Sequence, residues 1–115
     1  MNRTTLFARS ANKIRIEEQL TRCRQVASNK GLPFESASIV IDTCRRAALL
    51  TKRRPIYQQL LASIRRGACD LVVVDSLIVL TSDIEEFADL WILVMAGTLR
   101  IVTVDGVDTG WRSAP

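Results

Sequence analysis

The sequence contains no histidine among its 115 residues, which removes the commonest general base and a frequent metal ligand. Its three cysteines, Cys23, Cys44 and Cys69, stand far apart and form no Cys-x-x-Cys pair, so we expect no structural zinc site. No cofactor is expected. Cys23 and Cys69 fall in apolar patterns and are predicted to be core residues. This use of cysteine is typical of a reducing compartment and predicts a cytoplasmic protein.

Long hydrophobic runs are also absent. The longest, LWILVMAG, is far too short to span a membrane, and the opening residues, MNRTTLFARS, lack the apolar stretch of a signal peptide. Repeats, low-complexity stretches and an internal domain boundary are missing as well, so residues 1–115 are predicted to form a single domain. The net charge of +4 permits an acidic partner such as nucleic acid without requiring one.

Strand and helix patterns alternate along the chain. Unbroken apolar runs predict strands, and apolar residues at helical spacing, bounded by caps, predict helices. Gly31 is predicted to end the first helix, and either Ser82 with Glu85 or Asp83 with Glu86 supplies a capping box for the last. This order predicts an α/β fold, a three-layer domain with a parallel sheet between helices. Strands are expected at 4–9, 36–41, 70–75 and 99–106, and helices at 14–30, 55–67 and 83–96.

Polar residues follow the carboxyl ends of these strands, where parallel sheets usually place their sites. Arg9 and Ser10 follow the first strand, a basic segment follows the second, and Asp75 follows the third. A hydroxyl surrounded by arginines suits attack on a phosphodiester, because arginine neutralises phosphate charge. The alternatives are a solvated basic loop and a nucleotide- or phosphate-binding domain, although neither common glycine-rich phosphate loop is present. The basic residues of the second loop are Arg45, Arg46, Lys52, Arg53 and Arg54.

Five segments, in order, carry a resemblance that covers residues 4–110. They read LFARSAN, EEQLTRCRQVASNKGL, KRRPIYQQLLASIRRGACDLVVVDSL, LTSDIEEFADL and RIVTVDGVDT. Together they resemble the catalytic domain of the serine recombinases, the resolvase/invertase family. The resemblance implies a flavodoxin-like parallel sheet and a family activity in which DNA is cut through a covalent phosphoserine, with arginines stabilising the phosphate and no metal.

The resemblance carries over only part of the family's site. Arg9 matches the arginine of the opening Y-x-R-x-S motif, and Arg54 matches a further site arginine. The serine of that motif falls on Ala11 when the register is kept without a gap. Ser10 takes the nucleophile's role only if the turn shifts by one residue. The remaining basic residues, Arg45, Arg46, Lys52 and Arg53, are candidates for weak, salt-sensitive contact with DNA phosphates.

The family's central charges are missing from the chain. After V-V-V-x-x-L the family carries D-R-L-x-R, and here Ile78 stands for the aspartate, Val79 for the first arginine and Ser82 for the second. Losing one preorganised donor commonly costs about 3 kcal/mol in a barrier. The sequence therefore predicts an inactive recombinase-like domain that serves as an accessory or protein-interaction module or is a relic of a mobile element. The alternative is a divergent but active recombinase that cuts DNA through Ser10.

The predicted partners follow from the same comparison. The sequence stops at Pro115, before the family's long dimer helix and DNA-reading module, so we expect only weak and non-specific DNA binding. Another recombinase-type protein and a second copy of the chain are the other expected partners, since the segment FADLWILVM predicts an apolar patch around Trp91. In the competing interpretation Trp91 is an ordinary core residue. No membrane partner is expected.

Overall fold

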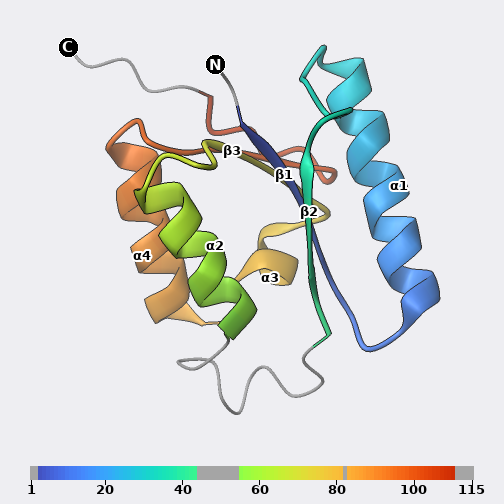
Figure 1. Ribbon diagram of the computed structural model, residues 1–115, viewed down its shortest axis with the longest axis horizontal. Helices are drawn as coiled ribbons and strands as arrows, with labels where there is room; N and C mark the ends of the chain where they lie inside the picture. The colour runs from blue at the N-terminus through green and yellow to red at the C-terminus, as the bar shows by residue number, and fades with distance from the viewer. Residues whose placement is uncertain (1–2, 44–54, 82, 111–115) are drawn as a thin grey trace.

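The chain forms one four-stranded parallel sheet with the strand order β2-β1-β3-β4 (Figure 1). The computed structural model describes residues 3–43, 55–81 and 83–110. This order is that of flavodoxin-like folds and confirms the predicted α/β class. The strands are β1 (Thr4–Arg9), β2 (Ser38–Asp42), β3 (Leu71–Val74) and β4 (Arg100–Thr103).

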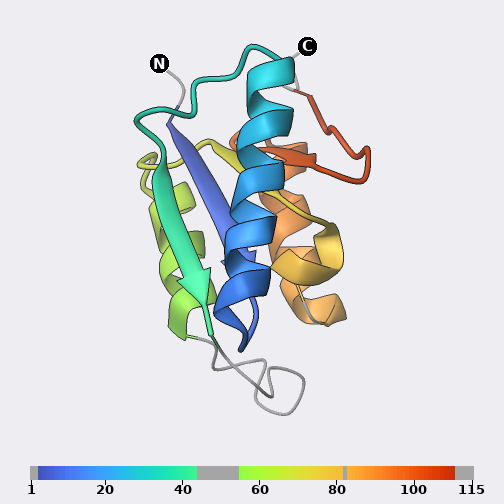
Figure 2. The ribbon, with the colours of Figure 1, turned by 90° about the vertical axis from the view of Figure 1, so that its right-hand side faces the viewer.

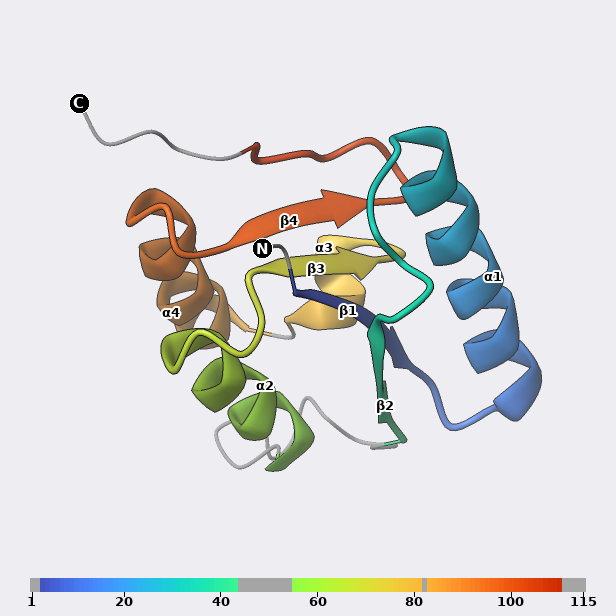
Figure 3. The same cartoon turned by 45° about the horizontal axis from the view of Figure 1, so that its top comes forward.

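Helices cover both faces of the sheet and complete the three layers (Figure 3). On one face, α1 (Lys13–Asn29) buries Ile16 and Leu20 against Leu6 and Ala8 of β1. On the other face, Phe7 of β1 packs with side chains from three helices. These are α2 (Pro55–Arg65), the single-turn α3 (Leu77–Leu80) and α4 (Ile84–Met95). The alternation of Leu6, Phe7 and Ala8 between two cores follows from the twofold period of a strand.

Local sequence signals set most of the helix ends. The Asn12 side chain accepts hydrogen bonds from the backbone N–H groups of Ile14 and Arg15 and so caps α1. Gly31, with φ at 69°, terminates α1 as predicted. Asp83 caps α4 by accepting from the Glu86 N–H at 2.8 Å, which selects the second of the two predicted capping boxes. None of the described helices is long and apolar enough to cross a membrane.

Three segments differ from the sequence-based expectation. Strand β2 begins at Ser38 rather than at residue 36, because residues 34–37 form a turn closed by the Ala37 N–H and the Phe34 carbonyl. The run after β3 contains the extra helix α3 instead of a plain loop. β4 is shorter than predicted and is followed by a turn, after which residues 107–109 return antiparallel to it. Thr109 N–H donates to the Ile101 carbonyl at 3.0 Å there.

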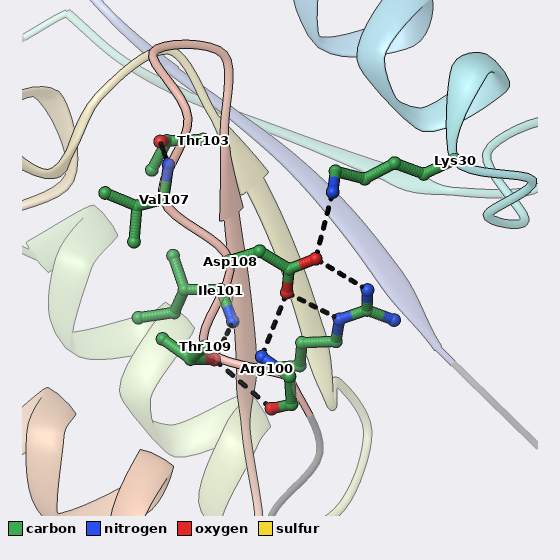
Figure 4. Close-up of polar contacts among 8 residues, drawn as sticks. Lys30, Arg100, Ile101, Thr103, Val107, Asp108 and Thr109 are labelled. Carbon is green, nitrogen blue, oxygen red and sulfur yellow. Dashed lines mark hydrogen bonds and ion pairs between the residues drawn. The ribbon is translucent and has the colours of Figure 1, made fainter.

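A charged cluster fastens this returning segment at the amino end of the sheet (Figure 4). The Asp108 carboxylate accepts two hydrogen bonds from the Arg100 guanidinium, at 3.0 and 2.9 Å, and one from Lys30 Nζ at 3.0 Å. The hydrogen bonds from Arg100 are the main reason that the pKa of Asp108 lies well below its usual range. The contact of Lys30 with Asp108 joins the end of α1 to the returning segment across 78 residues of sequence.

Candidate functional site

The ends of β1, β2 and β3 meet at the carboxyl edge of the sheet, where the sequence analysis placed the candidate site. Arg9 and Asp42 are register partners in the last positions of β1 and β2. The Ser10 N–H donates to the Asp42 carbonyl at 3.1 Å, so the pairing continues one residue beyond β1. Asp75 follows β3 directly. The parallel sheet thus brings Arg9, Ser10, Asp42 and Asp75 to one edge.

Gln19 fixes the end of β1 against α1. Its side-chain oxygen accepts from the Arg9 N–H at 2.9 Å, and its amide nitrogen donates to the Arg9 carbonyl at 3.1 Å. Gln19 is buried, and the paired contact satisfies both backbone groups of Arg9 on that side. Sequence analysis did not single out Gln19 for this role. Its position one turn before Cys23 on the apolar stripe of α1 was the available signal.

Ser10 is half-buried and its hydroxyl oxygen takes part in the turn into α1. The Asn12 N–H donates to Ser10 Oγ at 3.0 Å. A nucleophilic serine needs a base that accepts its proton, and a backbone N–H is a donor that cannot do so. Ala11, the position that keeps the family register, is exposed. The geometry therefore gives Ser10 a role in shaping the β1–α1 turn.

An ion pair joins α1 to the residue that follows β3. Arg22 Nε lies 2.7 Å from Asp75 Oδ1, and Glu18 Oε2 lies 4.0 Å from the same guanidinium. The hydrogen bond to Asp75 raises the pKa of Arg22. Sequence analysis noted Asp75 but missed Arg22, which is 53 residues away along the chain. The charge of this arginine is therefore already matched by carboxylates within the chain.

Helix α3 holds Ile78 and Val79, two of the three positions where the family resemblance predicts a missing charge. Ile78 is 79% exposed, whereas Val79 is half-buried against the core that includes Leu80. Thr81 ends the turn by donating its N–H to the Leu77 carbonyl at 2.8 Å. Beside α3 lies a shallow hollow with a mostly apolar lining, formed by Leu77, Ile78, Thr81, Asp83, Ile84 and Phe87. No arginine or lysine contributes to this described lining.

The remaining candidate residues fall into two groups. Cys23 and Cys69 are buried as predicted, and burial raises the pKa of the Cys23 thiol to about 12, so it stays protonated near neutral pH. Among residues 3–43, 55–81 and 83–110, no cluster of side chains could hold a metal ion. The other candidate residues lie outside these ranges. They are Ser82, which the resemblance sets at the family's second arginine, Trp111, and the basic residues Arg45, Arg46, Lys52, Arg53 and Arg54.

A second candidate surface runs along α4 and is called the α4 face below. Exposed apolar side chains recur at helical spacing: Ile84 is 81% exposed, Ile92 67% and Met95 51%. Phe87 and Trp91 lie between them, half-buried and stacked with ring centroids 5.5 Å apart. Trp91 thus contacts the core and also borders the exposed stripe. The predicted apolar patch and the alternative of a core residue each hold in part.

Comparisons with known proteins agree with this architecture. The family model described as "Resolvase, N terminal domain" matches residues 8–113. The chain is similar in structure to the N-terminal catalytic domain of TP901-1 integrase, with a TM-score of 0.69 and 21% identity over 94% of this chain and 82% of that one. It is also similar to the C-terminal catalytic domain of ISC1926 TnpA, an IS607-like serine recombinase. There the TM-score is 0.68, with 20% identity over 89% of this chain and 67% of the other. A search of the curated proteins finds no match.

Proposed function

Because the chain belongs to the resolvase family of serine recombinases, we propose that it is a recombinase-like domain that does not cut DNA and acts by binding another recombinase-type protein. One observation carries the first half of this proposal. By the resemblance, Ile78 and Val79 stand where the family carries its aspartate and first arginine; neither residue is charged, and Ile78 is 79% exposed.

The energetics of phosphoryl transfer support the loss of cleavage. Charge on the transferring phosphate must be met by cations placed before the reaction. Each lost donor raises the barrier by about 3 kcal/mol, which slows the reaction roughly a hundredfold or more. Near the same edge, Arg22 is engaged by Asp75, and Ser10 Oγ accepts a backbone N–H. Neither arrangement favours a serine activated for attack.

A covalent adduct assay tests this half of the proposal. The purified chain and its Ser10→Ala variant are incubated with supercoiled plasmid and with a pool of nicked random-sequence duplexes, and denatured samples are examined for protein linked to DNA. We expect no adduct from either protein. An adduct that forms with the wild type and disappears with Ser10→Ala would contradict the proposal and favour a divergent active recombinase.

The α4 face supports the binding half. Three large aliphatic residues of this face are more than half exposed, and Ile78 of α3, which lines one hollow with Ile84, is a fourth. An apolar patch of this kind commonly marks an interaction surface. Exposed Glu85 and Asp89 flank the stripe on α4. Apolar side chains bordered by carboxylates suit an amphipathic helix with basic flanks, because such a helix buries its apolar side and matches the charge. The four exposed residues are Ile78, Ile84, Ile92 and Met95.

A matched pair of variants tests the surface. The labelled chain is titrated with a full-length serine recombinase encoded in the same genome, and binding is followed by fluorescence anisotropy. We expect Ile92→Asp to weaken binding at least about tenfold, since it places a charge in an apolar contact. Ile14→Asp, which changes an isoleucine 70% exposed on α1, should leave binding unchanged. Equal effects of the two variants, or no binding by the wild type, would contradict the proposal.

A further inference from the structure

Strand β2 lies at the edge of the sheet and exposes two isoleucines. In the part of the chain that the structure describes, β1 is its one neighbouring strand. Ile39 is 48% exposed and Ile41 is 40% exposed. Both point to the α1 side of the sheet, because they are register partners of Leu6 and Ala8 in the core beneath α1. Figure 2 shows the reason for their exposure: α1 crosses in front of β1 and leaves β2 beside it.

The backbone of these two isoleucines faces the open edge. The Asp42 carbonyl accepts the Ser10 N–H, so the polar groups of Asp42 point toward β1. Along a strand this direction alternates from residue to residue. The N–H and C=O groups of Val40 therefore also point toward β1. Those of Ile39 and Ile41 point away from it, so the same two residues present exposed side chains and outward backbone groups.

We propose that two copies of the chain associate through antiparallel pairing of β2 with β2, centred on Val40. A twofold axis at this residue sets Ile39 opposite Ile41 of the second copy. Residues whose N–H and C=O groups both face the partner form the hydrogen-bonded pairs of an antiparallel ladder, and here these are the isoleucines. Their side chains then lie on one face and form a shared patch of four isoleucines. The residues whose backbone groups point outward are thus the same residues whose apolar side chains are exposed, and a second copy of this strand satisfies both.

The strand lacks the features that commonly block edge pairing. Its sequence, SIVID, contains no proline or lysine, and its one charged residue, Asp42, is 3% exposed at the end of the strand. On the α2 side, a hollow of about 410 Å³ borders β2 and includes Ile56, Gln59 and Arg66 in its lining, so α2 leaves space beside this face of β2. A five-residue ladder is a small interface, and we expect a dissociation constant on the order of 10–100 µM.

This association is independent of the α4 face and of any loss of catalysis. Sedimentation velocity over a concentration series from about 5 to 500 µM measures it, since this range brackets the expected constant. We expect Ile41→Lys to raise the dissociation constant at least about tenfold, because a lysine on an edge strand opposes pairing. Ile14→Lys makes the same change on the exposed side of α1 and should leave the constant unchanged. Ile92→Lys makes it on the α4 face and should also have no effect.

Amide hydrogen exchange of the wild type supplies a second measurement that needs no variant. The amides of Ile39 and Ile41 should become protected as the concentration rises, while that of Val40 should be protected at every concentration. A monomer throughout the series would overturn the proposal. So would a dimer abolished by Ile92→Lys but kept by Ile41→Lys, or a dimer in which the amides of Ile39 and Ile41 exchange freely.

Discussion

Replacing Asp108 with asparagine should destabilise the fold in a pH-dependent way. Asp108 accepts hydrogen bonds from the Arg100 guanidinium, from Lys30 and from the Gly110 N–H, so Asp108→Asn keeps the shape of the side chain but removes the charge that draws two cations together. The cluster connects α1, β4 and the returning segment, so its loss should lower the free energy of global unfolding (Figure 4).

The magnitude follows from the exposure of each partner. The side chains of Arg100 and Asp108 are 17% and 25% exposed, so their bidentate pair is worth about 1.5 kcal/mol. Lys30 is 40% exposed and contributes only about 0.5 kcal/mol. The total loss is about 2 kcal/mol. With an unfolding entropy of about 2.1 cal/mol/K per residue, this corresponds to a decrease of roughly 8 °C in the melting temperature of a 115-residue chain.

The pH dependence gives the sharper test. The folded-state pKa of Asp108 is lowered, so the unfolded chain binds a proton first as the pH falls. The stabilisation is complete above about pH 5 and is lost at about 1.4 kcal/mol per pH unit below the unfolded pKa of about 3.9. Urea unfolding should therefore show a difference between wild type and Asp108→Asn of about 2 kcal/mol at pH 7 and about 1 kcal/mol at pH 3.

Two controls separate this effect from general consequences of charge removal. Asp89→Asn removes an exposed carboxylate of α4 and should change stability by less than about 0.5 kcal/mol at either pH. Lys30→Met removes one arm of the cluster and should cost about 0.5 kcal/mol. Equal stability of wild type and Asp108→Asn at pH 7, or a difference that stays constant down to pH 3, would refute the reasoning.

Two further substitutions probe how the carboxyl edge and the core are held. Gln19→Leu should cost about 2 kcal/mol, because both backbone groups of Arg9 lose a buried partner, and hydrogen exchange of the Arg9 amide should accelerate; an unchanged exchange rate would show that the clamp is not maintained in solution. Tyr57→Phe removes a buried hydroxyl that donates to the Glu86 carbonyl at 2.9 Å and should lower the free energy of unfolding by about 1–2 kcal/mol, measured in urea; a fully stable variant would contradict this value.

Several parts of the fold could be predicted from local sequence. The unbroken apolar run 71–74 is a strand buried on both faces, as expected for the interior of a parallel sheet. Gly31 ends α1, and Asp83 with Glu86 begins α4, because caps depend on residues only a few positions apart. The absence of charge at Ile78 and Val79 is likewise visible in the sequence, and it carries the proposal about function.

Other features depend on residues that meet only in the folded chain. Arg22 finds Asp75 across 53 residues, and Lys30 finds Asp108 across 78. Such ion pairs have no periodic signal, because the partners lie on separate elements whose relative position is set by packing. The helix α3 was also missed, since a single apolar turn is indistinguishable by pattern from the continuation of a buried strand.

The sequence by itself determined the class of the fold, the order of its elements and the uncharged character of Ile78 and Val79, because these follow from periodicity, caps and residue identity along the chain. Only the tertiary structure decided that α1 packs over β1 and leaves Ile39 and Ile41 exposed, and that Lys30 meets Asp108. The physical reason is the same in both cases. An apolar strand residue is buried or exposed according to where a distant helix lies, and a carboxylate pairs with the cation that a separate element places beside it.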